Sequence, residues 1–184
     1  VLLGPMINLA RVPTGGRNFE STGEDPILSA VYASEFIMGV QSDVGIMACA
    51  KHFVDNNQEQ DRTTVSVTIV TRSQWDLYTP QFQASVDSGV ASFMCSYNKI
   101  NTTWACENDE MLNKYLKGKM GFKGFVMSDW GATHSTVQAA NAGLDMEMPS
   151  EDFFGAALTQ AVKEGSVPES RITDMVHRFL LLQF

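Results

Sequence analysis

The stretch G-F-V-M-S-D-W-G, residues 124–131, joins a short apolar run to a carboxylate and an indole. A continuous apolar run of this kind is typical of a buried strand in a parallel sheet. Asp129 follows the run directly, so we expect it where the strand ends and a loop begins. An aspartate there can act as a catalytic carboxylate beside the aromatic surface of Trp130, or it can cap the next helix.

Similar short runs occur on both sides of this stretch, with helical patterns between them. Strands are predicted at 2–8, 46–50, 64–70, 90–96, 124–128 and 143–148. Helices are predicted at 25–39, 73–88, 108–120, 136–142, 150–164 and 168–182. We expect Asp25 and Ser150 to be N-caps, and Pro80 to kink the second helix.

This alternation predicts an α/β fold with parallel strands covered by helices, either an open sheet or a (β/α) barrel. A complete eight-unit barrel usually needs ~250 residues, and the chain has 184. A barrel reading therefore implies that units are missing. Both ends are apolar and no signal peptide is visible, so we interpret residues 1–184 as one partial domain of a longer protein.

The composition excludes several classes of function. The net charge is −8, which disfavours a nucleic-acid partner because phosphate binding needs clustered basic residues. No run approaches the ~18 apolar residues of a membrane span. The sequence has no phosphate-binding glycine motif and no zinc-ligand spacing, so we expect neither a cofactor nor a metal.

The three cysteines include a pair, Cys95 and Cys106, that could form a disulfide in an oxidising compartment or remain as buried free thiols. Asn101, in Asn-Thr-Thr, is the one glycosylation sequon. It would matter only in a secreted eukaryotic protein.

Polar residues gather where the predicted strands end, which is where barrel enzymes carry their active sites. Lys51 and His52 follow the 46–50 run, and Tyr97 follows the 90–96 run. Strand alternation would send Lys51 and His52 in opposite directions, although a bulge or loop could bring them together. The alternative is one buried histidine beside one surface lysine.

Three further features have both a functional and a structural interpretation. Arg17 follows two glycines, where the backbone can turn sharply toward a site. The polar loop 56–62 is more typical of a structural network than of a site. Met94 suits either the core or a pocket wall.

Five segments, in order and at matching spacing, resemble glycoside hydrolase family 3, in its β-glucosidase branch. They are RVPTGGRNFESTGEDP (11–26), KHFVDNNQEQDR (51–62), FMCSYNKIN (93–101), GFKGFVMSDWGA (121–132) and GLDMEMP (143–149). The stretch after Lys51-His52 differs from the K-H-F-P-G-H-G-D pattern of the family's N-acetylglucosaminidases. The resemblance covers essentially the whole chain.

The resemblance implies a role for each matching residue. Asp129 matches the catalytic nucleophile of a retaining enzyme, and Lys51, His52 and Arg17 match residues that bind the glucose unit. Tyr97 lies against the reacting centre in the family, whereas Met94 and Trp130 match pocket walls. Asp145 and Glu147 look like an acid pair, but the family does not use them so.

The resemblance also implies a larger protein. The family fold is a (β/α)8 barrel followed by an α/β sandwich domain that supplies the acid/base glutamate. This chain would then be a barrel segment without its first strands, inactive by itself, from a secreted enzyme of carbohydrate and cellulose breakdown. Alternatives are a truncated barrel without activity and a β-xylosidase or exo-glucanase of the same family.

Overall fold

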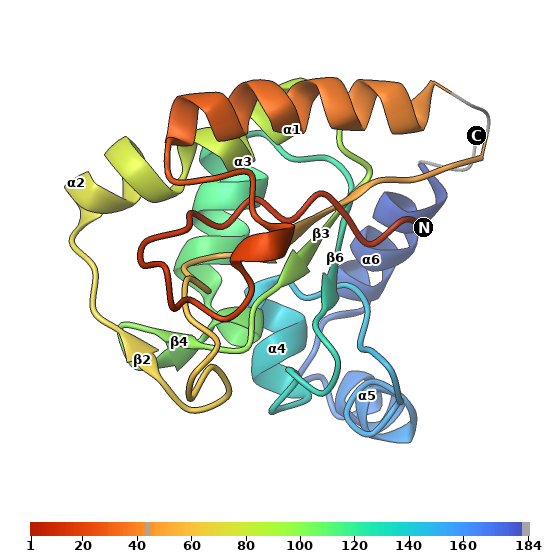
Figure 1. Cartoon of the computed structure of the whole chain (residues 1–184). Helices are drawn as coiled ribbons and strands as arrows, with labels where there is room; N and C mark the ends of the chain where they lie inside the picture. Colours follow the sequence, from red (N-terminus) through yellow and green to blue (C-terminus); the bar gives the residue numbers. More distant parts are fainter. Residues whose placement is uncertain (43–44, 182–184) are drawn as a thin grey trace.

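A computed structural model describes residues 1–42 and 45–181 and shows a parallel sheet flanked by helices (Figure 1). The central strands lie in the order β1 (Cys49–Phe53), β3 (Ser92–Cys95) and β6 (Phe125–Ser128), all parallel. The predicted strand 2–8 adds two parallel bridges to the β1 side, Leu2 with Ala48 and Met6 with Lys51. The predicted strand 143–148 adds one bridge, between Met127 and Met146. The α/β class is confirmed, with the two outer segments as bridges and not as continuous strands.

The first central strand begins three residues later than predicted. Ile46, which starts the predicted run, is 46% exposed, whereas Ala48 to Ala50 are fully buried. Ile46 is apolar but faces solvent and lies outside the sheet, so the apolar run in the sequence begins before the strand does. Lys51 and His52 therefore lie inside β1, whereas the sequence placed them after it.

A small second sheet lies to one side of the central sheet (Figure 1). In it β2 (Ser66–Val67) pairs in parallel with β4 (Lys99–Ile100), which pairs antiparallel with β5 (Thr103–Trp104). The prediction of a strand at 64–70 is thus correct for two of its residues. This sheet ties the loop after β1 to the loop after β3.

The helix α1 (Pro26–Gln41) begins as predicted. The Asp25 carboxylate accepts hydrogen bonds from the backbone N–H of Ile27 and Leu28, at 2.7 and 3.3 Å. Proline in the first turn costs no hydrogen bond. The helix packs on α3 (Pro80–Asp87).

The predicted helix 73–88 is divided. It consists of α2 (Thr71–Ser73), the π-type turn η2 (Gln74–Tyr78) and α3. Pro80 starts α3 instead of kinking one continuous helix, because a proline without N–H fits a first turn better than a helix interior.

The remaining helices are η1 (Asn18–Glu20), η3 (Ala105–Glu107), η4 (Glu110–Lys119), α4 (Val137–Ala142), α5 (Ala156–Lys163) and α6 (Glu169–Leu180). Four of these helices lie within predicted ranges, whereas the short helices η1 and η3 were not predicted. The prediction that Ser150 caps α5 is wrong, because the helix starts after Gly155. The Ser150 hydroxyl donates to Asp152 instead, and the Glu147 carboxylate binds the backbone N–H of Phe153 and Phe154.

The sheet separates two apolar clusters by strand alternation. Phe53, Phe82, Phe93 and Phe122 form the aromatic centre of the helix-covered side, with Phe93 and Phe122 centroids 4.9 Å apart. Cys49, Met94, Phe125 and Met127 form the opposite side, with Phe179 of α6 packed against them. No described helix has the length and apolar character needed to cross a membrane.

Asp145 is the centre of a buried ion-pair network. It is bound by Lys117 at 2.8 Å, by Arg171 at 2.6 Å and by the backbone N–H of Val126 at 2.8 Å. Burial lowers the pKa of Lys117 to about 8, and the Asp145 carboxylate opposes that fall. The residue anchors η4 and α6 to the start of β6, which is a structural role.

We expect Asp145→Ala to destabilise the protein by about 3–5 kcal/mol, because it leaves two buried cations without a partner. Differential scanning calorimetry of the full-length protein, on the transition of this domain, measures the loss. Asp152→Ala, at an exposed carboxylate, is the matched control. Equal unfolding temperatures for the two variants would contradict the structural role.

Candidate active site

Asp129 lies at the carboxyl end of β6, where the predicted loop begins. It continues the alternation of Phe125 and Met127, so its side chain is on the same side of the sheet as that apolar cluster. Oδ1 accepts the Trp130 N–H at 2.8 Å. Oδ2 is buried and has no hydrogen-bond partner among residues 1–42 and 45–181. A buried oxygen without a partner needs a functional explanation.

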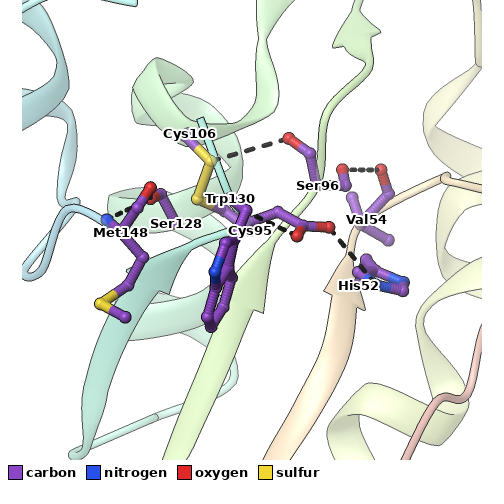
Figure 2. Close-up of a disulfide and its surroundings, with 9 residues drawn as sticks. His52, Val54, Cys95, Ser96, Cys106, Ser128, Trp130 and Met148 are labelled. Carbon is purple, nitrogen blue, oxygen red and sulfur yellow. Dashed lines mark hydrogen bonds and ion pairs between the residues drawn. A yellow bond between two sulfur atoms is a disulfide. The ribbon is translucent and has the colours of Figure 1, made fainter. Parts of the chain in front are cut away.

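His52 lies 3.4 Å from this oxygen, measured from Nε2 to Oδ2 (Figure 2). A bulge in β1 places the His52 side chain on the same side of the sheet as Asp129. Lys51 pairs with Met94 and Phe53 with Cys95, so His52 is the extra residue in the register. A bulge interrupts the alternation and lets neighbouring side chains point the same way.

Glu20 joins the two cations of the site. It binds Arg17 through both carboxylate oxygens, at 2.8 and 3.0 Å, and Lys51 Nζ at 3.4 Å. Arg17 Nη1 in turn lies 3.4 Å from His52 Nε2. Hydrogen bonds from Arg17 are the main cause of a lowered pKa for Glu20. The Glu20 carboxylate therefore stays ionised and clamps Arg17 and Lys51 together.

Tyr97 closes the site from the β3 side. Its hydroxyl donates to the Trp130 carbonyl at 3.0 Å, and its ring lies 4.6 Å below the Arg62 guanidinium. Burial, and then the nearby Asp129 carboxylate, raise the pKa of Tyr97 to about 12, so the phenol keeps its proton. The polar loop 56–62 thus reaches the site through Arg62, in addition to the Arg62–Glu59 ion pair at 3.1 Å.

The other predicted residues are divided between the site and the core. Trp130 is 42% exposed, beside Asp129, and offers a free aromatic surface at the rim. Met94 is 2% exposed and packs within the apolar cluster under the site. Among the described residues, no group of three or more histidine, cysteine or acidic side chains is arranged to hold a metal ion.

Cys95 and Cys106 form a disulfide beside the site, with their Cα atoms 5.2 Å apart (Figure 2). Cys95 ends β3 and immediately precedes Ser96 and Tyr97, so the bridge fixes the start of the loop that carries Tyr97. Asn101 is exposed, and its Oδ1 accepts the Ile69 N–H at 3.2 Å.

The sequence did not assign roles to two residues of the site. Glu20 lies in the segment 11–26 that carries the resemblance, but no role was assigned to it there. Asn8 had no predicted role, although it is 2% exposed and both its side-chain oxygen and nitrogen bind His52. An asparagine at the end of a predicted buried strand is the sequence signal that could have pointed to it.

Comparison with known proteins assigns the family. The model of the glycosyl hydrolase family 3 N-terminal domain matches residues 1–182. "Probable beta-glucosidase L" of Emericella nidulans is 50% identical over 98% of this chain and 26% of that protein. Beta-glucosidase cel3A of Pyricularia oryzae is 46% identical over 98% of this chain and 26% of that protein.

Solved structures agree with the sequence relatives. The crystal structure of a beta-D-glucoside glucohydrolase from Trichoderma reesei matches with a TM-score of 0.93 and 47% identity, over 98% of this chain and 26% of that chain. Beta-glucosidase 3B from Thermotoga neapolitana in complex with glucose matches with a TM-score of 0.93 and 39% identity, over 98% of this chain and 26% of that chain. The chain spans about a quarter of the length of these proteins. It belongs to the glycosyl hydrolase family 3 N-terminal domain family.

Proposed function

We propose that the full-length protein hydrolyses terminal, non-reducing β-D-glucosyl units of cellobiose, cello-oligosaccharides and aryl glucosides, with Asp129 as the nucleophile. The observation that carries the proposal is the Asp129 Oδ2 atom. It is buried at the strand ends, has no hydrogen-bond partner among the described residues and is surrounded by Arg17, His52 and Tyr97. Relatives that match nearly the whole chain bear the name beta-glucosidase.

In this mechanism Asp129 attacks the anomeric carbon as the bond to the leaving oxygen breaks. A carboxylic acid about 5–5.5 Å away protonates that oxygen, which gives a covalent glycosyl-enzyme. The same group then takes a proton from water, which displaces Asp129 and restores the free enzyme. The product keeps the β configuration because the anomeric carbon is inverted twice.

The residues around Asp129 would hold the sugar. Arg17 and Lys51 would donate to its hydroxyls, and His52 would bind a further hydroxyl through its ring. Tyr97 keeps its proton and would lie against the reacting centre, while Trp130 and Met94 would form walls of the pocket. Glu20 would hold these two cations in place by binding both of them.

The remaining parts of the enzyme are also proposals. The parallel sheet would be a segment of a (β/α)8 barrel, and an α/β sandwich domain outside this chain would supply the acid/base glutamate. The relatives are about four times longer than this chain, which leaves room for both. A disulfide and a sequon at Asn101 suit a secreted protein, in which Asn101 would carry a glycan.

The test is hydrolysis of p-nitrophenyl β-D-glucoside by the full-length protein, followed by proton NMR of the first product formed. We expect β-glucose to appear before its α anomer. The α anomer first would reject the covalent mechanism. A higher rate on the matching xyloside would reassign the substrate to a β-xylosidase, a higher rate on laminarin or another glucan would indicate an exo-glucanase, and no hydrolysis of any of them would support a barrel without activity.

We expect Glu20→Gln to raise KM for the aryl glucoside roughly threefold to thirtyfold with a smaller change in kcat, because Arg17 and Lys51 lose a shared charged partner. Steady-state kinetics of the full-length protein measure the change. Glu24→Gln, at an exposed glutamate of the same loop, is the control and should leave KM unchanged. Equal kinetics for the two variants would remove Glu20 from the site.

A further inference from the structure

The side-chain amide of Asn8 has only one orientation that its partners allow. Asn8 Nδ2 donates to the carbonyl oxygen of His52 at 2.9 Å, and the backbone N–H of His52 donates to Asn8 Oδ1 at 2.8 Å. A backbone N–H is always a donor and a backbone carbonyl always an acceptor. Exchanging the nitrogen and oxygen of the amide would break both bonds, so Oδ1 must be the atom beside the imidazole.

This orientation decides which nitrogen of the His52 ring carries hydrogen. Asn8 Oδ1 lies 3.2 Å from His52 Nδ1. Because this oxygen is an acceptor, Nδ1 must be the donor and carry the hydrogen. In a neutral imidazole the other nitrogen, Nε2, then has a lone pair and no hydrogen.

The charges around His52 favour the neutral ring. Burial lowers its pKa well below the ordinary value, and Arg17, Lys51 and Arg62 lower it further. Arg17 comes from the loop before η1, Lys51 from β1 and Arg62 from the loop before β2. Among residues 1–42 and 45–181, Asp129, after β6, is the one anion in ion-pair distance of the ring, and Glu20 is occupied with Arg17 and Lys51.

The contacts of Nε2 fit a lone pair. Arg17 Nη1, a donor, lies 3.4 Å away, and so does Asp129 Oδ2, an acceptor. An Nε2 without hydrogen offers Oδ2 nothing to accept, and that oxygen has no hydrogen-bond partner among the described residues. A protonated ring would instead donate to Oδ2 and cover the attacking atom.

We infer that Asn8 is a positioning residue: it holds His52 in the Nδ1–H tautomer, so that Nε2 accepts a hydrogen bond from a sugar hydroxyl and leaves the nucleophilic oxygen of Asp129 free. This role rests on the proposed glucosidase function, but the tautomer itself does not. Asn8 acts through His52 and contacts neither Asp129 nor the reacting atoms. It belongs to the segment before η1, 44 residues from its partner.

The direct test is nitrogen NMR of the full-length protein with ¹⁵N-labelled histidine at pH 7, with the His52 signals identified from a His52→Gln sample. We expect a pyrrole-type signal from Nδ1 and a pyridine-type signal from Nε2. The opposite tautomer, or a ring protonated on both nitrogens, would overturn the inference. This readout does not depend on activity, so it is separate from a failure of the proposed function.

The kinetic test is Asn8→Asp, which keeps an oxygen acceptor next to Nδ1, adds a negative charge and removes the Nδ2 donor to the His52 carbonyl oxygen. That charge raises the pKa of His52, so His52 gains a proton as the pH falls and donates to Asp129 Oδ2. We expect kcat/KM relative to wild type to fall roughly tenfold between pH 7 and pH 5.

Asn57→Asp is the matched control for the added charge. Asn57 Nδ2 also donates to a backbone carbonyl, that of Leu9 at 2.9 Å, and has no contact with His52. Its pH profile should follow wild type. Identical pH profiles for the two variants would refute the role of Asn8. A wild-type protein inactive on glucosides at every pH would reject the proposed function and leave the NMR result to decide the tautomer.

Discussion

Asp129→Ala in the full-length protein is expected to lower kcat for aryl β-glucosides by about a thousandfold or more, because the covalent step loses its nucleophile. The substitution removes two carboxylate oxygens, of which Oδ1 binds only the neighbouring Trp130 N–H within the described part of the chain. The fold should tolerate this loss. Steady-state kinetics, with circular dichroism to check the fold, measure the effect.

Covalent labelling identifies the atom that attacks. A 2-fluoro-glucoside should label Asp129 in the wild-type protein, and peptide mass spectrometry locates the label. Asp152→Asn, at an exposed carboxylate, is the control and should keep both activity and labelling. A label on any other residue, or activity within tenfold of wild type in Asp129→Ala, would reject Asp129 as the nucleophile.

Residues 1–184 expressed alone are expected to be poorly stable and inactive on cellobiose. The outward face of α1 presents Ile27, Leu28 and Val31, each between 58 and 66% exposed, and such an apolar face promotes association. Loss of the general acid alone typically lowers the rate of hydrolysis by a factor of ~10²–10⁴. Size-exclusion chromatography and glucose release from cellobiose measure the two effects.

The choice of substrate separates the two reasons for inactivity. An activated aryl glucoside needs little help from an acid, so a trace of activity on it fits a folded but incomplete site. The full-length protein is the positive control for both substrates. A soluble monomer of residues 1–184 that cleaves cellobiose at the rate of the full-length protein would contradict the proposal that the acid lies outside the chain.

The central strands could be predicted from the sequence because they are buried on both faces. Runs such as 90–96 and 124–128 are mostly apolar and contain no charged residue, and the structure places β3 and β6 inside them. Boundaries were less certain where burial changes within a run, as at Ile46. Ser150 resembled an N-cap, but Glu147 holds the following backbone N–H groups in a turn before α5 begins. A local sequence pattern does not show which of two nearby side chains will bind the backbone N–H groups.

The residues of the candidate site are likewise of two kinds, those that the sequence predicted and those that it did not. Asp129 and Tyr97 could be found because they follow β6 and β3, where loops meet in a parallel sheet, and Lys51 and His52 because they follow an apolar run, although they lie within the last three residues of β1. The clamp between Glu20 and Lys51 and the contacts of Asn8 with His52 could not, because their partners are 31 and 44 residues apart in the chain. Such pairs become visible only once the register of the sheet is known.

The bulge in β1 determines which sequence changes this domain can accept. The extra residue, His52, lies after the register of Cys49, Ala50 and Lys51 with β3 and before Phe53 returns to pairing with Cys95. Side chains here can be exchanged one at a time without moving the backbone. Deleting a single residue at this point would instead restore strict alternation and leave only one polar side chain of this strand facing the site. Evolution of this segment should therefore proceed by substitution, with the length between Ala50 and Phe53 kept constant.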